Sequence, residues 1–112
     1  MTQPIKVARV GDIPDGEGIT VPKQTTGTVD DIAVFNDGGS YFALDDTCTH
    51  EETSLAEGWV EDGTVECPLH SAKFCLRDGS VLCLPATRPV AAHEVVVEGD
   101  DILVIPNESR LA

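Results

Sequence analysis

Two short segments, Cys48-Thr49-His50 and Cys67-Pro68-Leu69-His70, decide how this chain is interpreted. Each segment holds one cysteine and one histidine, and sixteen residues lie between the two segments. Two loops that each present a thiolate and an imidazole can converge on one metal site. The sequence therefore predicts a single metal centre. Its ligands are Cys48, His50, Cys67 and His70.

This ligand set is compatible with two kinds of centre. Two histidines replace two cysteines on one iron of a Rieske-type [2Fe–2S] cluster. The same four side chains could also hold a structural zinc ion. Finger-type zinc sites pair like with like, whereas this chain alternates cysteine and histidine in both segments. The alternation favours one [2Fe–2S] cluster. The alternative, from a different functional class, is a zinc-stabilised interaction module.

Outside these segments the pattern predicts an all-β domain. Short runs rich in β-branched residues are separated by Gly, Asp and Asn, and no amphipathic stretch is long enough for a substantial helix. Strands are expected over residues 5–10, 19–21, 31–35, 41–44, 73–76, 80–82, 94–97 and 102–105. The polar tail that follows need not be ordered.

Length and charge limit the possible functions. A chain of 112 residues suits one domain. Twenty acidic residues against seven basic ones give a net charge of −13, which disfavours nucleic acid and anionic membranes and favours a basic protein partner. No apolar run approaches the roughly 18 residues of a membrane-spanning helix, and no secretory signal is visible, so a cytoplasmic protein is expected.

The chain resembles the Rieske family, whose pattern C-x-H, about sixteen residues, C-x₂-H is matched at all four ligands. The similarity extends to residues 57–60, 65–70 and 73–76 and to Asp78-Gly79. The resemblance implies a Rieske (ISP-like) fold of antiparallel sheets with an inserted cluster-binding subdomain. Residues 1–112 would form a single domain, in which 1–44 and 85–112 form a β base and 45–84 bind the cluster.

The resemblance also indicates which kind of Rieske protein this is. Respiratory Rieske proteins carry a disulfide between the cluster loops, near the positions held here by Thr53 and Leu69, which cannot form it. Cys75 and Cys83 flank the Asp78-Gly79 turn and are assigned to packing rather than to a disulfide. Ser71 is interpreted as a turn residue. Fewer hydrogen bonds to the cluster sulfurs favour a low reduction potential.

The sequence predicts that this chain is not itself an enzyme. With His50 and His70 committed, only His93 remains, so a site with two histidines and a carboxylate for a catalytic iron cannot be built. His93 is expected to have a surface or hydrogen-bonded structural role. No G-x-G-x-x-G segment opens a nucleotide-binding helix. Electrons must therefore come from another protein.

The resemblance implies a one-electron carrier from an NAD(P)H-dependent reductase to the terminal oxygenase of an aromatic-ring-hydroxylating dioxygenase system. The alternative within the family is the small subunit of an assimilatory nitrite reductase. A carrier that meets two partners in turn is most simply a monomer. Both ligand histidine rings are expected at the surface, with Leu69 and Pro85 as docking contacts. Glu51 and Glu52 either steer basic partners or form a solvated acidic loop.

Overall fold

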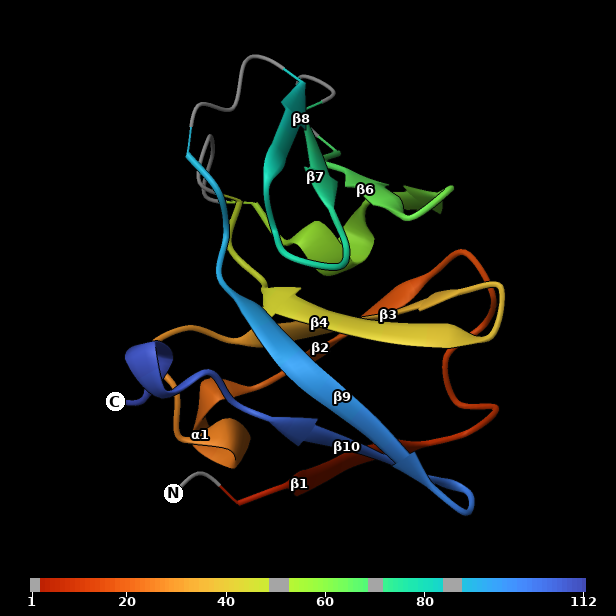
Figure 1. Ribbon diagram of the computed structural model, residues 1–112, viewed down its shortest axis with the longest axis vertical. Coiled ribbons are helices and arrows are strands. Elements are labelled where there is room, and N and C mark those ends of the chain that lie inside the picture. The colour runs from red at the N-terminus through yellow and green to blue at the C-terminus, as the bar shows by residue number, and fades with distance from the viewer. Residues whose placement is uncertain (1–2, 49–52, 69–71, 84–87) are drawn as a thin grey trace.

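The computed structural model describes residues 3–48, 53–68, 72–83 and 88–112. It consists of two antiparallel sheets, one above the other in Figure 1, with both labelled chain ends in the lower part. The lower sheet has the strand order β1-β10-β9-β4-β3-β2 and the upper sheet has the order β5-β6-β7-β8. The expected all-β class and antiparallel pairing are confirmed.

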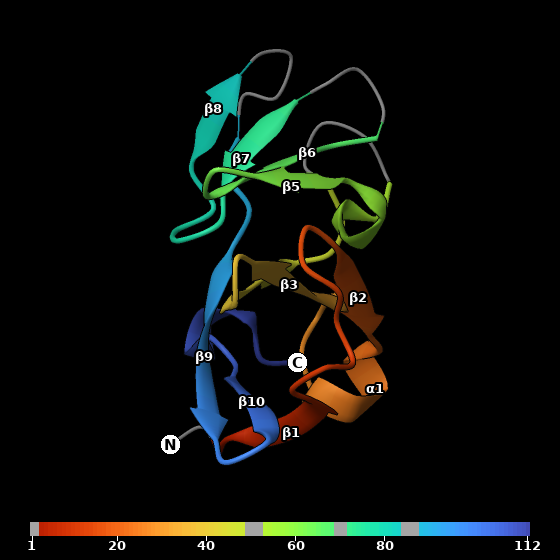
Figure 2. The same ribbon diagram turned by 90° about the vertical axis from the view of Figure 1, so that its right-hand side faces the viewer.

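The lower sheet combines strands from both ends of the chain. Its members are β1 (Ile5–Arg9), β2 (Gly18–Val21), β3 (Ile32–Asp37), β4 (Ser40–Asp45), β9 (Ala92–Glu98) and β10 (Asp101–Ile105). Strand β9 pairs with β10 and also with β4, through Ala43 opposite His93 and Leu44 opposite Ala92. These pairings join the N-terminal and C-terminal segments in one sheet, which curls around its own core (Figure 2).

The upper sheet is built from four short strands. They are β5 (Trp59–Glu61), β6 (Thr64–Glu66), β7 (Lys73–Cys75) and β8 (Val81–Cys83). The sequence pattern predicted β7 and β8 but missed β5 and β6, although Asp62-Gly63 between them is an Asp-Gly turn like Asp78-Gly79. A 3₁₀ helix, Leu55–Glu57, precedes β5, with Leu55 and Ala56 buried.

Strand β3 explains how the two sheets stay together. Every residue from Ile32 to Asn36 is buried. Ile32 and Val34 belong to the core of the lower sheet, whereas Ala33 and Phe35 belong to a second core shared with the upper sheet. Successive strand residues point to opposite faces, so a strand buried on both faces reads as a continuous apolar run.

The β3–β4 turn, the helix and the C-terminal tail differ in detail from the sequence-based expectations. Strands β3 and β4 extend to Asp37 and Ser40, leaving only Gly38 and Gly39 in the turn, both at positive φ as a tight hairpin requires. A single four-residue α-helix, α1 (Lys23–Thr26), occurs in the described ranges. The C-terminal tail, for which no structure was predicted, is ordered. It forms the 3₁₀ helix Glu108–Arg110.

Candidate metal centre

The two predicted cysteine ligands lie in the core shared by the sheets. Cys48 follows β4 after two intervening residues, and Cys67 directly follows β6. Both are almost completely buried, at 2% and 0% exposure, among Leu55, Val65 and Phe74. A buried pair of cysteines in an apolar, water-excluding setting suits a thiolate-ligated iron centre.

Each cysteine begins a loop that closes in the same way. The backbone N–H of Cys48 donates to the carbonyl oxygen of Thr53 at 2.9 Å, and that of Cys67 donates to the carbonyl oxygen of Ala72 at 2.7 Å. In both cases the hydrogen bond spans five positions of the chain. The second loop lies at the end of the β6–β7 hairpin, where Glu66 pairs with Lys73. The sequence thus forms two similarly closed loops.

Two of the four predicted ligands, His50 and His70, lie outside the described residues. Glu51, Glu52, Leu69, Ser71 and Pro85 also lie outside them, so the expected ring exposure, the docking contacts and the role of the acidic loop stay predictions. Within the described ranges, no three His, Cys, Asp or Glu side chains come together as a metal site. Cys48 and Cys67 are the two predicted ligands that the structure describes.

Two carboxylates hold the base of the first loop. Asp46 Oδ1 accepts hydrogen bonds from the hydroxyl of Ser54 at 2.9 Å and from the backbone N–H of Ala56 at 3.0 Å. These donors lie just beyond the loop, so the Asp46 side chain links its two ends. Burial raises the pKa of the Asp46 carboxyl, while the hydrogen bonds from Ala56, Ser54 and Thr20 act in the opposite direction.

The second carboxylate comes from the segment before β3. Asp30 accepts hydrogen bonds from the backbone N–H of Thr47 at 3.0 Å and from its hydroxyl at 2.9 Å. Thr47 directly precedes Cys48, so Asp30 fixes the chain where it enters the loop. Sequence reasoning missed Asp30 and Asp46. The position of Asp46 two residues before the first ligand was the available signal, whereas the contact of Asp30 with Thr47 depends on the fold.

A close backbone approach fixes the second loop against the 3₁₀ helix. A Cβ atom on Gly58 would collide with the carbonyl oxygen of Glu66, the residue before Cys67. Gly58 has an extended backbone, so the small side chain is needed for space rather than for an unusual φ. The absence of a side chain lets the end of this helix lie directly against the strand that carries the second cysteine.

Cys75, Cys83 and His93 are the cysteines and the histidine outside the predicted ligand set. Cys75 carries a free thiol, as expected from the packing assignment. His93 is buried, with its side chain fully shielded, and its Nε2 lies 2.8 Å from Oδ1 of Asp45. The hydrogen-bonded structural role of His93 is confirmed, and the surface alternative is wrong. The side chain of Cys83 lies outside the part of the chain that can be described.

Two buried cysteines on similarly closed loops between β-sheets suit the thiolate ligands of an iron–sulfur protein of the electron-carrier class. A model of the Rieske [2Fe-2S] domain matches residues 3–97. The chain belongs to the Rieske [2Fe–2S] domain family, and it is an electron-transfer protein with one Rieske-type [2Fe–2S] cluster.

Known proteins of similar sequence and structure support this membership. The 3-phenylpropionate/cinnamic acid dioxygenase ferredoxin subunit of Escherichia coli (strain K12) is 48% identical over 96 residues, 85% of this chain and 86% of that protein. The ferredoxin of carbazole 1,9a-dioxygenase from Nocardioides aromaticivorans IC177 has a TM-score of 0.84 and 34% identity, covering 95% of this chain and 100% of that chain.

A third similar protein was solved together with its partner. It is the ferredoxin in a complex of reduced oxygenase and oxidised ferredoxin of carbazole 1,9a-dioxygenase. The match has a TM-score of 0.83 and 30% identity and covers 94% of both chains. No helix in the described ranges is long and apolar enough to cross a membrane.

Proposed function

We propose that Cys48, His50, Cys67 and His70 hold the [2Fe–2S] cluster, with the two cysteines on one iron and the two histidines on the other. The observation that carries this proposal is the pair of loops closed from Cys48 N–H and Cys67 N–H, with both cysteines buried. The alternating order of cysteine and histidine in the sequence supports the cluster over zinc.

The cluster, when bound, accepts and releases one electron. The residues of the chain hold it and control its surroundings. Cys48 and Cys67 provide anionic sulfur from within a core that excludes water. Asp46 and Asp30 keep the first loop in position through the hydrogen bonds at its base. A preformed site of this kind needs little rearrangement when the electron arrives or leaves.

We propose that the chain carries electrons from an NAD(P)H-dependent reductase to the terminal oxygenase of an aromatic-ring-hydroxylating dioxygenase system, as a cytoplasmic monomer. The relative from Escherichia coli is a dioxygenase ferredoxin subunit at 48% identity, and a similar ferredoxin forms a complex with its oxygenase. The acidic surface fits transient contact with basic proteins. The small subunit of an assimilatory nitrite reductase is the competing assignment within the family.

The division of the chain is part of this proposal. Residues 1–44 and 85–112 would form the base, and residues 45–84 would form the cluster-binding subdomain. The strand order supports the division, because β1 to β4, β9 and β10 make up one sheet and β5 to β8 make up the other. The core shared between the sheets supports one folding unit.

The decisive experiment combines cluster chemistry with electron transfer. The purified protein should contain two irons and two sulfides per chain, and after reduction it should show the electron paramagnetic resonance spectrum of a histidine-ligated cluster. It should then support product formation by a dioxygenase and its reductase. A single zinc ion would overturn the cluster assignment, and transfer of electrons to a nitrite reductase alone would replace the dioxygenase partner.

Substitutions test the ligands one by one. Cys48→Ser or Cys67→Ser should lose most of the iron, while Cys75→Ser provides a matched control that keeps it, because Cys75 packs outside the proposed ligand set. His50→Cys and His70→Cys should change the reduction potential and its pH dependence, since an ionisable neutral ligand is replaced by an anionic one. Behaviour like that of the wild type would contradict the assignment of that histidine.

A further inference from the structure

The upper sheet has one covered face and one open face. Strand pairing places Val60, Val65 and Phe74 side by side on the face that packs against the core. The next positions along each strand point the other way. On that outer face, Trp59 lies opposite Glu66, which in turn lies opposite Lys73. This face therefore presents an aromatic side chain next to charged ones.

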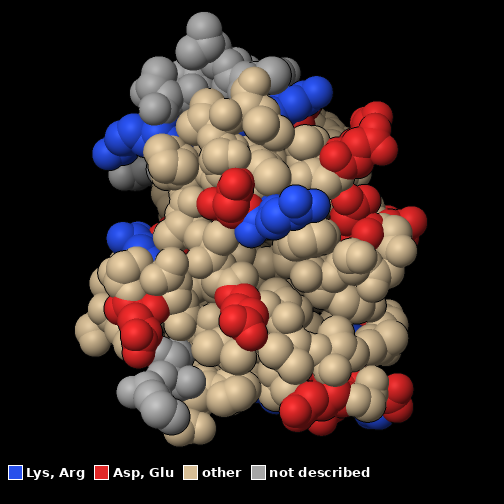
Figure 3. All heavy atoms as spheres, viewed as in Figure 1, with Lys and Arg blue, Asp and Glu red and all other residues tan. Residues whose placement is uncertain are grey.

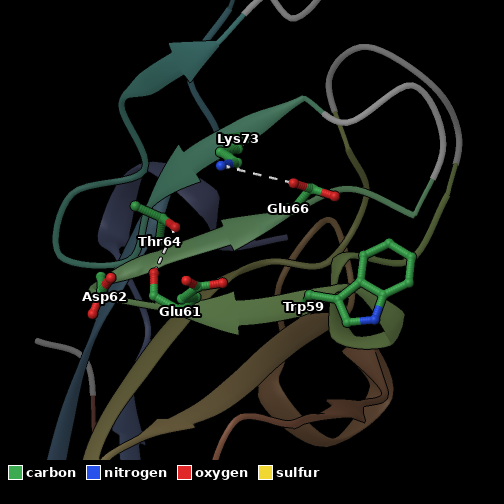
Figure 4. A pocket seen from close by; sticks show the side chains of 6 residues that line it. All are labelled: Trp59, Glu61, Asp62, Thr64, Glu66 and Lys73. Atoms are coloured by element: carbon green, nitrogen blue, oxygen red, sulfur yellow. Dashed lines mark hydrogen bonds and ion pairs between the residues drawn. The ribbon is translucent and has the colours of Figure 1, made fainter.

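The outer face is hollowed. The hollow has a volume of about 220 Å³. In Figure 4 the Trp59 indole stands at one end, Glu61 and Asp62 lie at the other, and Glu66 and Lys73 point toward each other. Its lining residues are Trp59, Glu61, Asp62, Thr64, Glu66 and Lys73.

Trp59 is unusually exposed for its size and chemistry. Its exposure is 61%, and it is the only tryptophan in the chain. Leaving a large aromatic ring in water forgoes the stabilisation that its burial would give. Exposed tryptophan is enriched where proteins bind one another, because a rigid ring gives a large contact area at low entropic cost. The position of Trp59 on a hollow of the open face suits such a contact.

The charges around the ring are mainly negative. Three carboxylates and one ammonium group line the hollow, which gives a net charge of −2. Lys73 Nζ lies 3.8 Å from Glu66 Oε1 and so offsets one carboxylate. In the described part of the chain, the carboxylates of Glu61 and Asp62 have no Lys or Arg at ion-pair distance. Figure 3 shows acidic side chains gathered along the right-hand edge of the upper half of the molecule.

We propose that this hollow anchors a lysine or arginine side chain from the surface of an electron-transfer partner protein. The cation would lie on the face of the Trp59 ring, which attracts cations, with Glu66 on the paired strand beside it and Glu61 farther along the hollow. Nucleic acid and anionic lipid are excluded as occupants by the repulsion from the same carboxylates. The inference rests on the proposed function, because it assumes that a protein partner exchanges electrons with this chain.

The hollow is well placed for that role. Glu66 directly precedes Cys67, which lies buried beneath the same end of the sheet. A partner anchored at Trp59 and Glu66 is therefore held beside the cluster-binding loops. Charges at the rim of such a contact mainly raise the rate of association and make it sensitive to salt. Lys73 acts against binding, since its ammonium group repels the incoming cation and already pairs with the Glu66 carboxylate.

The test uses the holoprotein and single-turnover reduction of a terminal oxygenase, that of the Escherichia coli 3-phenylpropionate/cinnamic acid dioxygenase. Trp59→Ala and Glu61→Gln should each raise the apparent Kd about two- to fivefold, a factor typical of one exposed cation–π contact or charge pair. Lys73→Gln should lower the apparent Kd and strengthen its dependence on salt. Val97→Ala and Glu98→Gln, exposed positions on β9, are the matched controls.

The outcomes separate this inference from the function on which it rests. Each variant should keep the reduction potential and the electron paramagnetic resonance spectrum of the wild type, which shows that only docking has changed. If Trp59→Ala matches Val97→Ala, or if Lys73→Gln weakens binding, the docking inference is overturned while the carrier function stands. If the wild type cannot reduce the oxygenase, the partner assignment fails.

In that last case a second measurement decides the docking inference. The fluorescence of Trp59, the single tryptophan, is titrated with cytochrome c, a lysine-rich protein that accepts one electron. At low salt the fluorescence should change saturably with cytochrome c concentration. If Glu61→Gln weakens this binding and Glu98→Gln does not, the result supports the anchor. An unchanged signal, or equal effects of the two substitutions, overturns it.

Discussion

Nε2 of His93 lies 2.8 Å from Oδ1 of Asp45, and both side chains are buried. Nδ1 of His93 accepts a hydrogen bond from the backbone N–H of Asn107 at 2.9 Å, so the ring carries its hydrogen on Nε2 and donates it to Asp45. Oδ2 of Asp45 accepts from Arg110 at 2.7 Å. This network ties the C-terminal tail to the end of β4.

Replacing Asp45 by alanine should destabilise the protein. The substitution leaves the buried Nε2–H of His93 without an acceptor, and such a group costs about 1–3 kcal/mol. Thermal and urea unfolding of the holoprotein would measure the loss. Asp100→Ala is the matched control, since Asp100 is largely exposed and its contact with Arg9 is long, 4.0 Å. Equal effects of the two substitutions would contradict a structural role for the network.

Gly79 should tolerate no side chain. Its φ is +76°, and a Cβ atom would collide with the carbonyl oxygen of Val90. The N–H of Val90 donates to the carbonyl oxygen of Gly79 at 3.0 Å, so this contact joins the β7–β8 turn to the chain leading into β9. Gly79→Ala should lower the free energy of unfolding by about 2–4 kcal/mol, through strain and displaced backbone.

Gly99 provides the matched comparison for Gly79. It also has a positive φ, +59°, but a Cβ atom added there would meet nothing within 4 Å. Gly99→Ala should therefore cost only the backbone strain, about 1 kcal/mol. Unfolding in urea would measure the stability of both variants. If Gly79→Ala lost no more unfolding free energy than Gly99→Ala, the close contact with Val90 would not be what excludes a side chain at Gly79.

The sequence predicted most of the lower sheet, because its strands and turns depend on local patterns. The two proposed ligand segments are likewise visible in the sequence alone. A tight turn at Gly38-Gly39 and apolar runs such as residues 32–35 are visible without knowledge of the fold. The Asp45–His93 pair joins residues 48 positions apart, and no local pattern could predict it. The hollow beside Trp59 was missed for a related reason, because it is lined by residues of β5, β6 and β7 that only the pairing of these strands brings together.

The Asp78 carboxyl should make stability depend on pH only in acid. The backbone N–H of Ser80 donates to Asp78 at 2.9 Å, and this hydrogen bond, helped by the Ser80 hydroxyl, lowers the pKa of the carboxyl below its ordinary value of 3.8. A carboxyl with a lowered folded-state pKa stabilises the fold above the unfolded-state pKa, and its contribution is lost as the pH falls through the folded-state pKa.

The measurement compares the wild type with Asp78→Asn in urea at several pH values. Their difference in stability should stay constant from neutral pH down to about 4.5, where the carboxyl is ionised in both states. It should shrink below pH 3.8, as the unfolded chain takes up the proton first. A difference that grows toward acid would have the wrong sign for a lowered pKa.

The reduction potential should lie at the low end of the Rieske range, on the order of −150 mV. Thr53 stands where a respiratory Rieske protein would have a cysteine of its loop disulfide, and the carboxylates of Asp30 and Asp46 lie at the base of the first loop. Nearby negative charge disfavours the reduced cluster, because the reduced cluster carries one more negative charge than the oxidised cluster. A redox titration followed by circular dichroism would give the value, and a strongly positive potential would contradict this subclass.

Asp46→Asn isolates the contribution of charge to that potential. The asparagine Oδ1 can still accept from Ser54 and Ala56, and its amide can donate to the hydroxyl of Thr20, so the loop keeps its hydrogen bonds. Loss of the negative charge should shift the potential upward at pH 8, and less so at high salt. Asp100→Asn, on the distant β9–β10 turn, should leave the potential unchanged. An unchanged potential in Asp46→Asn would mean that hydrogen bonding and burial, rather than this carboxylate, keep the potential low.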